Sequence, residues 1–97
     1  MKHGCHVYIL TNKNNTVLYT GVTSNLCQRL WQHQHSVHEK AFTKMYRVTK
    51  LVYYEEFDRI ENAIAREKQI KAGSRQKKLD LVNTFNPGWK YLGGRFI

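Results

Sequence analysis

The sequence predicts a small α+β domain in which three strands alternate with helices. Three short apolar runs rich in β-branched and aromatic residues are typical of buried strands. Between and after these runs lie segments in which apolar residues recur every three or four positions, as they do on one face of a helix. The chain has 97 residues, too few for two hydrophobic cores. We therefore expect a single domain over residues 1–97.

The first two strands are expected to pair as an antiparallel hairpin. One apolar run covers residues 7–10 and the next covers 17–19, and the Asn-rich segment 12–15 between them is typical of a turn. Gly21 is expected to close the second strand, at a point where the backbone needs a close approach or a positive φ. A third strand is predicted over residues 51–57.

Capping residues and apolar spacing predict three helices. Asn25 is expected to cap the first, with Gln28 at the capping-box position. Asp58 is expected to cap the second, and Ser74 the third. The buried face of the second helix is expected to carry Ile60, Ala63, Ile64 and Ile70. The aromatic C-terminal tail is expected to fold back over the core.

The charge of the chain narrows the choice of partner. It has 16 Lys and Arg against 7 Asp and Glu, which gives a formal net charge of +9. A net charge of this size favours a polyanionic partner, most commonly nucleic acid. No segment combines a basic face with an apolar Trp/Phe/Leu face, so we do not expect a membrane partner.

Basic side chains fall into two stretches that would flank a phosphate backbone and make binding strongly dependent on salt. Such stretches are most often solvated faces, so charge alone does not assign a function. The residues expected to contact nucleic acid are Arg29, Lys44, Arg47, Lys68, Lys71 and Arg75.

The two cysteines, Cys5 and Cys27, form no CxxC pair and no disulfide framework. Free thiols are typical of a reducing compartment. The N-terminal segment lacks the apolar stretch of a secretory signal, and no run is long enough to span a bilayer. The expected location is the cytoplasm.

Glu67 is the most informative single residue, because it interrupts the apolar face of the second predicted helix. A carboxylate there is costly unless it is paired or binds a cation. One interpretation is an ion pair with Lys71, four residues further on the same face. The other is a metal site, and a single carboxylate with several waters suits Mg²⁺ or Mn²⁺.

Four further polar side chains could complete a phosphodiester-cleaving site. Arg29 and His33 are four residues apart on the first predicted helix, where they could grip a phosphate and carry a proton. Tyr8 and Tyr19 lie on the paired strands. Buried tyrosines are usually core residues, and a free phenol has a pKa near 10. Either tyrosine could act as a base only if a cation or a neighbouring base helped to remove its proton.

Taken in order, these residues resemble the GIY-YIG nuclease domain, and the resemblance runs from about residue 7 to residue 89. His6-Val7-Tyr8 and Tyr19-Thr20-Gly21 stand where that family has its two tripeptides. His6 replaces the first Gly, and Thr20 replaces the middle Ile. The other residues that match the family are its helix Arg and His, its metal-binding Glu and its late Asn, here Arg29, His33, Glu67 and Asn86. The small stand-alone bacterial branch is the most similar.

The resemblance implies a three-stranded antiparallel sheet flanked by helices. It also implies hydrolysis of DNA phosphodiester bonds with one divalent metal, Mg²⁺ or Mn²⁺, held by Glu67. Because the chain has no room for an added DNA-binding domain, it is expected to recognise the structure or the backbone of the DNA, or to gain specificity from a protein partner. DNA repair and recombination would supply such substrates.

Two other functions stay open at this stage. A nucleic-acid-binding module without catalysis would use the same charge, with Trp31, Trp89 and Tyr91 as stacking groups. Such a module has no need of a carboxylate beside phosphates. A domain that binds an acidic protein is the third possibility.

Overall fold

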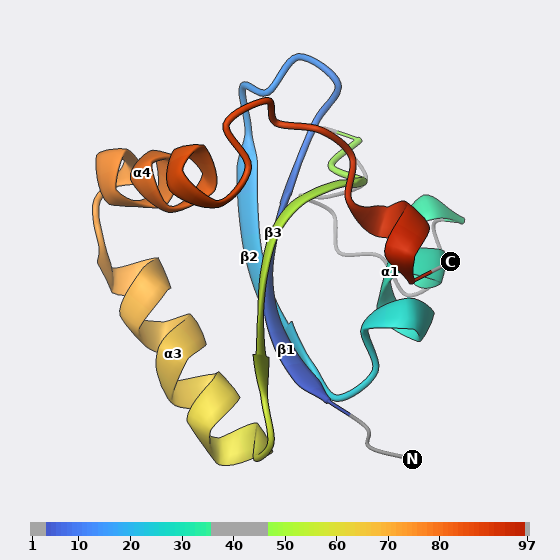
Figure 1. Ribbon diagram of the computed structural model, residues 1–97, viewed down its shortest axis with the longest axis vertical. Helices are drawn as coiled ribbons and strands as arrows, with labels where there is room; N and C mark the ends of the chain where they lie inside the picture. Colours follow the sequence, from blue (N-terminus) through green and yellow to red (C-terminus); the bar gives the residue numbers. More distant parts are fainter. Residues whose placement is uncertain (1–3, 36–46, 97) are drawn as a thin grey trace.

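The predicted α+β architecture is confirmed in the computed structural model, which describes residues 4–35 and 47–96. A three-stranded antiparallel sheet lies between helices on its two faces (Figure 1). The elements follow in chain order as β1 (Cys5–Thr11), β2 (Leu18–Thr23), α1 (Leu26–Gln34), β3 (Lys50–Phe57), α3 (Ile60–Ala72), α4 (Arg75–Phe85) and the short 3₁₀ helix η1 (Gly93–Arg95). Residues 1–3, 36–46 and 97 lie outside the described residues.

The sheet has the order β2-β1-β3, so that β1 is central and pairs antiparallel with both neighbours. The predicted hairpin is confirmed, and its turn is held by the Asn12 side chain, whose Oδ1 accepts from the backbone N–H of Thr16 at 2.8 Å and of Val17 at 3.2 Å. The expectation that Gly21 ends β2 was wrong, because the strand continues to Thr23. No described glycine has a positive φ, so Gly21 is needed for close approach alone.

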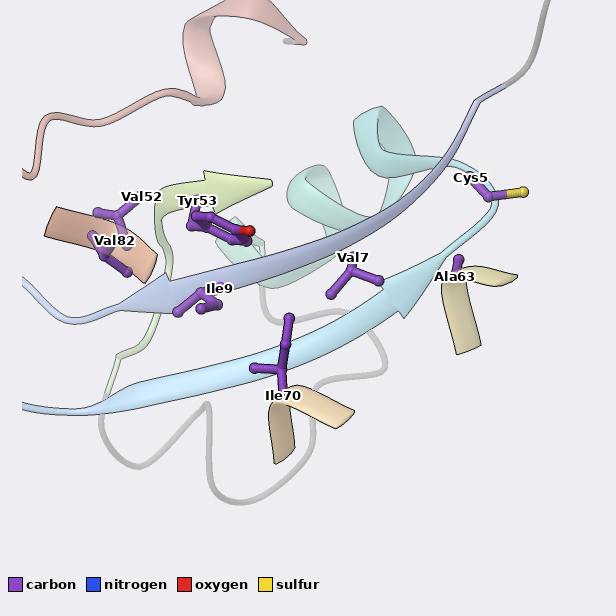
Figure 2. Packing of buried hydrophobic residues seen from close by; sticks show 8 residues of the cluster. All are labelled: Cys5, Val7, Ile9, Val52, Tyr53, Ala63, Ile70 and Val82. Atoms are coloured by element: carbon purple, nitrogen blue, oxygen red, sulfur yellow. The ribbon is translucent and has the colours of Figure 1, made fainter. Parts of the chain in front are cut away.

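Side chains of β1 alternate between two buried clusters, as the pleat of a strand requires. Val7 and Ile9 pack with residues of α3 and α4 (Figure 2). Tyr8 and Leu10 point to the other face and pack with Leu26 and Leu30 of α1. The same strand therefore contributes apolar packing to one face and the first candidate tyrosine to the other.

Local capping chemistry explains where two of the helices begin. Asn25 caps α1 by accepting from the Gln28 N–H at 3.0 Å, and Ser74 caps α4 by accepting from the Lys77 N–H at 3.2 Å, both as predicted. The third predicted cap was wrong by one residue, because the N-cap of α3 is Arg59 and not Asp58.

The buried face of α3 is narrower than expected. Ala63 and Ile70 are buried, but Ile60 and Ile64 are 36% and 38% exposed, which contradicts the expectation for those two residues. The buried positions of α3 are 63, 67 and 70, spaced by four and three residues. Glu67 therefore lies at the centre of this face.

The C-terminal tail folds back over the core, as predicted. The Leu92 N–H donates to the Leu51 carbonyl at 2.8 Å, and Leu92 and Phe96 pack against the cluster that contains Tyr8. Figure 1 shows η1 beside α1, on the face of the sheet opposite α3 and α4. Within residues 4–35 and 47–96, no helix is long and apolar enough to cross a membrane.

Candidate active site

Three of the predicted site residues form one ring cluster between the hairpin and α1. The ring centroids of Tyr8 and His33 are 6.1 Å apart, those of Tyr19 and His33 are 5.7 Å apart, and those of the two tyrosines are 6.4 Å apart. The Tyr8 hydroxyl lies 3.4 Å from Nε2 of His33. Side chains from β1, β2 and α1 therefore meet around one phenolic oxygen.

Gly21 makes this arrangement possible, because it lies directly opposite Tyr8 in the β1–β2 register. A Cβ atom at position 21 would lie only 2.5 Å from the Tyr8 hydroxyl. The phenol therefore extends across β2, which is the strand that α3 contacts most. The sequence identified Gly21 as a point of close approach, but the partner is defined only by the strand register.

The Tyr8 hydroxyl is in an environment that opposes ionisation. Burial of the side chain is the main factor that raises the pKa of Tyr8 well above its usual value, and the neighbouring Tyr19 and the Glu67 carboxylate raise it further. The Arg29 guanidinium acts in the opposite direction and lowers the pKa of Tyr8. Arg29 and Glu67 are therefore both close enough to affect this hydroxyl, although they come from different helices.

His33 is buried, and its imidazole is kept neutral. Burial, followed by the positive charge of Arg29, lowers the pKa of His33 to about 4. Among the described residues, Nδ1 of His33 is buried without a hydrogen-bond partner. A neutral imidazole beside the Tyr8 hydroxyl can accept a proton at pH 7.

Glu67 forms the ion pair with Lys71 that was one of its two expected roles. It is only 9% exposed, and its Oε2 lies 2.6 Å from Nζ of Lys71. The lysine is about half exposed, so the ion pair opens to solvent on one side. Among the described residues no three acidic, His or Cys side chains form a metal-binding group. The donor set therefore fits a cation that keeps most of its waters and takes one carboxylate, as Mg²⁺ does.

Arg29 and Asn86, like Glu67, take no part in the ring cluster. Arg29 is exposed on α1 and acts on Tyr8 and His33 through its charge. Asn86 is buried at the C-terminus of α4, beside the opposite edge strand, β3. Its Nδ2 donates to the carbonyls of Val52 at 3.1 Å and Lys90 at 2.9 Å, and its Oδ1 accepts from the Lys90 N–H. These bonds fix the tail to the sheet.

The comparison with protein families agrees with this geometry. The model of the GIY-YIG catalytic domain matches residues 4–80 of the chain. This chain belongs to the GIY-YIG family. The matched range includes both tripeptides, Arg29, His33 and Glu67, and it ends before Asn86. Membership in the GIY-YIG family indicates nuclease-type chemistry on a nucleic acid substrate.

The relatives of this GIY-YIG domain are small proteins of similar length. The chain is 42% identical over 77 residues to a UPF0213 protein of Syntrophus aciditrophicus, covering 79% of this chain and 87% of the relative. It is 40% identical over 78 residues to a UPF0213 protein of Staphylococcus saprophyticus, covering 80% and 93%. The solution NMR structure of the UPF0213 protein BH0048 from Bacillus halodurans is 30% identical with a TM-score of 0.51, over 88% of this chain and 87% of the other.

The two departures from the GIY-YIG tripeptides are accommodated by packing. His6 occupies the place of the first Gly, and its ring makes edge contacts with Tyr54 and Phe96, at centroid distances of 6.0 Å and 5.6 Å. Thr20 is buried within β2. Neither residue displaces Tyr8, Tyr19 or Gly21 from the ring cluster.

The basic residues predicted to contact nucleic acid differ in their surroundings. Arg47, Lys68 and Arg75 are exposed, and Arg75 donates to the Thr16 carbonyl at 2.9 Å. Lys71 is paired with Glu67. Lys44 lies outside the described residues.

A hollow of about 650 Å³ lies between α3 and α4 of the GIY-YIG domain. None of the predicted catalytic residues lines it within the described part of the chain. Its wall includes Tyr53 and Arg66, which both bond to Glu55 in a network that the sequence did not reveal. We place the candidate active site at the ring cluster, because Tyr8, Tyr19 and His33 meet there and none of the predicted catalytic residues, all of them described, lines the hollow between α3 and α4.

Proposed function

We propose that the chain is a divalent-metal-dependent endonuclease that hydrolyses DNA phosphodiester bonds. The observation that carries this proposal is the set of groups around the Tyr8 hydroxyl. An imidazole and a second phenol lie in ring contact with Tyr8, and a guanidinium and a carboxylate both influence its pKa. A nucleic-acid-binding module without catalysis would not need this combination.

Proton movement in the proposed reaction begins with the neutral His33. Its imidazole takes a proton from the Tyr8 hydroxyl, which lies 3.4 Å from Nε2. The Tyr8 phenolate then takes a proton from a water molecule, whose oxygen bonds to phosphorus while the bond from phosphorus to the leaving sugar oxygen breaks. The leaving oxygen takes up the proton that His33 accepted. Tyr19 contacts His33 from β2 and restricts its orientation. The pKa of Tyr8 is raised and that of His33 is lowered, so this transfer needs a cation to stabilise the phenolate and the phosphate charge of the substrate to stabilise the imidazolium.

Glu67 is the proposed ligand of that positive charge. Mg²⁺ or Mn²⁺ at this carboxylate would supply Lewis-acid polarisation of the phosphate and stabilise the leaving oxygen. Glu67 raises the pKa of Tyr8, so neutralising its charge removes one obstacle to phenol ionisation. Lys71 is exposed enough to leave the carboxylate when a cation takes its place.

The remaining residues bind and position the substrate. Arg29 is exposed beside the ring cluster, where its guanidinium can hold a phosphate oxygen and stabilise charge that develops on it. Asn86 is proposed as a positioning residue that keeps the tail against β3. Arg47, Lys68 and Arg75 contact the backbone of the DNA, so that recognition depends on structure and charge, with a protein partner as a source of further specificity.

The test is cleavage of supercoiled plasmid and of branched DNA with Mg²⁺ or Mn²⁺. Wild type is compared with Glu67→Gln and with Glu61→Gln, which changes an exposed carboxylate on the same helix. We expect Glu67→Gln to lower the cleavage rate by at least about 100-fold and Glu61→Gln to leave it unchanged. Equal cutting by wild type and Glu67→Gln would contradict the proposal. Salt-sensitive DNA binding by a wild type that does not cut would favour the binding module.

A further inference from the structure

A second hollow lies at one end of the sheet, where the β1–β2 turn, the last turn of α1 and the start of β3 come together. Its volume is about 640 Å³, which is in the range of small-ligand sites. Its polar lining sets it apart from the hollow between α3 and α4. The residues that line it are Asn12, Lys13, Asn14, Gln34, Arg47, Thr49, Lys50 and Tyr91.

The charged side chains among the described residues that line this hollow are all positive. Lys13, Arg47 and Lys50 supply three cations, and no acidic side chain is among the described residues that line it. Nζ of Lys50 donates to Oδ1 of Asn15 at 3.1 Å, which holds the ammonium group beside the turn without neutralising it. The backbone of Arg47 has a φ of 53°, a conformation that arginine rarely adopts. The described lining therefore brings three cationic side chains to one small volume with no acidic side chain among them.

An aromatic ring completes the hollow. Tyr91 is 44% exposed, and its hydroxyl accepts from Nε2 of Gln34 at 2.7 Å, which fixes the ring against the end of α1. An exposed and immobilised aromatic ring is a stacking surface for a nucleobase. The Asn14 side chain is exposed and also lines the hollow, where its amide can hydrogen-bond to a sugar or a base edge.

We propose that this hollow binds one nucleotide of the nucleic acid strand, with its phosphate on the three cations and its base against Tyr91. The inference rests on the proposed function, because it names how the same substrate is held. His33 of the ring cluster and Gln34 of the hollow are consecutive residues of α1. A strand that runs along the last turn of α1 therefore passes from this hollow to the ring cluster.

The first experiment measures binding without cleavage. The probes are short fluorescein-labelled single-stranded DNA and the corresponding duplex, titrated with the full chain in EDTA and followed by fluorescence anisotropy. Lys13→Ala/Lys50→Ala removes two cations from the hollow, and Lys77→Ala/Lys90→Ala removes the same charge from exposed positions elsewhere. We expect the first variant to reduce the slope of log K against log salt by about 1.4 for single strands, and the second to change it far less. Equal slopes for both variants would overturn the proposal.

The second experiment separates stacking from charge. Tyr91→Phe keeps the ring and Tyr91→Leu removes it, so we expect about tenfold weaker single-strand binding for Tyr91→Leu alone. Titration of AMP distinguishes a strand site from a free-nucleotide site, and AMP that binds as tightly as the oligonucleotide would overturn the strand assignment. Loss of binding in these variants without any cleavage by wild type would support this site while contradicting the nuclease. Cleavage by wild type together with unaltered binding by the variants would support the nuclease and contradict the nucleotide site.

Discussion

At the scale of single residues, the missing side chain of Gly21 has the greatest effect on the candidate site. It lies opposite Tyr8, and the phenol occupies the space where a Cβ atom would be. Even a methyl group would force either the phenol or the strand to move. The position of the Tyr8 hydroxyl near His33 therefore depends on a residue that performs no chemistry.

Gly21→Ala is expected to impair both stability and cleavage. Overpacking of a buried site usually costs about 1–3 kcal/mol of unfolding free energy, and displacement of the Tyr8 hydroxyl should lower the cleavage rate of the folded protein. Urea denaturation and single-turnover cleavage measure the two effects. The matched control is Gly94→Ala, where nothing lies within 4 Å of the added Cβ. A Gly21→Ala protein that cuts at the wild-type rate would contradict the role assigned to the phenol.

His33 predicts a dependence of stability on pH. Its pKa in the folded protein is lowered to about 4 from the ordinary 6.5, so between these values the unfolded chain binds more protons than the folded one. The contribution of neutral His33 is therefore fully present above pH 6.5 and is lost as pH falls toward 4. His6 has a lowered pKa too and acts in the same direction.

Urea denaturation at a series of pH values checks this expectation. The loss of unfolding free energy between pH 6.5 and 4 should be smaller for His33→Gln than for wild type. His35→Gln, at an exposed position two residues further along the chain, should behave as wild type does. An unchanged pH profile for His33→Gln would show that the imidazole is not held neutral by its surroundings.

At the scale of elements, α4 and the tail are joined to the sheet by one side chain. The amide of Asn86 satisfies the carbonyl of Val52 on β3 and both backbone groups of Lys90. The position is at the C-cap of α4, where the chain leaves the helix. Asn86 therefore determines where the tail begins its return across the molecule.

Asn86→Ala separates this structural role from a catalytic one. Loss of the buried amide leaves backbone groups without partners, so we expect a decrease of about 2–4 kcal/mol in unfolding free energy. Cleavage per folded molecule should stay near the wild-type value, provided the assay is run where the variant is folded. Asn83→Ala, on the same helix with one exposed bond to Trp89, should cost less than about 1 kcal/mol. A large loss of cleavage in a fully folded Asn86→Ala protein would instead indicate a direct catalytic role.

The elements that the sequence predicted well are those fixed by local chemistry. Asn25 and Ser74 begin their helices because a side-chain oxygen lies three residues before an unpaired N–H, and this spacing is visible in any sequence. The rotation of α3 about its own axis is not local. Ile60, Ile64 and Glu67 all fit an amphipathic pattern, and only the packing of α3 against β2 decides that Glu67 is buried and the two isoleucines are exposed.

The candidate site was predictable as a set of residues but not as a geometry. The helical spacing of polar residues indicated Arg29, His33 and Glu67, and the resemblance to the GIY-YIG family joined them to Tyr8 and Tyr19. The contact between Tyr8 and His33 spans 25 residues, and the opposition of Tyr8 to Gly21 depends on the strand register. No pattern within one segment encodes either relation. The hollow that contains Lys13, Lys50 and Tyr91 was missed for the same reason, because its lining comes from four separate segments.

At the scale of the whole molecule, the sheet divides the chain into two layers with different tasks. On one face, Val7, Ile9, Ala63, Ile70 and Val82 form an apolar cluster with α3 and α4 (Figure 2). On the other face, α1 and the tail cover Tyr8 and the rings beside it. Glu67 belongs to the first layer and acts on a hydroxyl of the second. The proposed reaction therefore depends on the edge of the sheet at β2, where the layers meet.

The ion pair between Glu67 and Lys71 affects whether the protein needs a metal in order to fold. A buried carboxylate without a counterion would oppose folding until a metal arrived, as it does in small domains that are unfolded without their ion. Here the counterion is Lys71 of the same helix, so the carboxylate of Glu67 is neutralised before any metal binds. Folding and binding of the proposed metal are therefore expected to be independent of each other. A chelator should therefore abolish DNA cleavage by the proposed enzyme without unfolding it. Adding the ion back should restore cleavage without a delay for refolding.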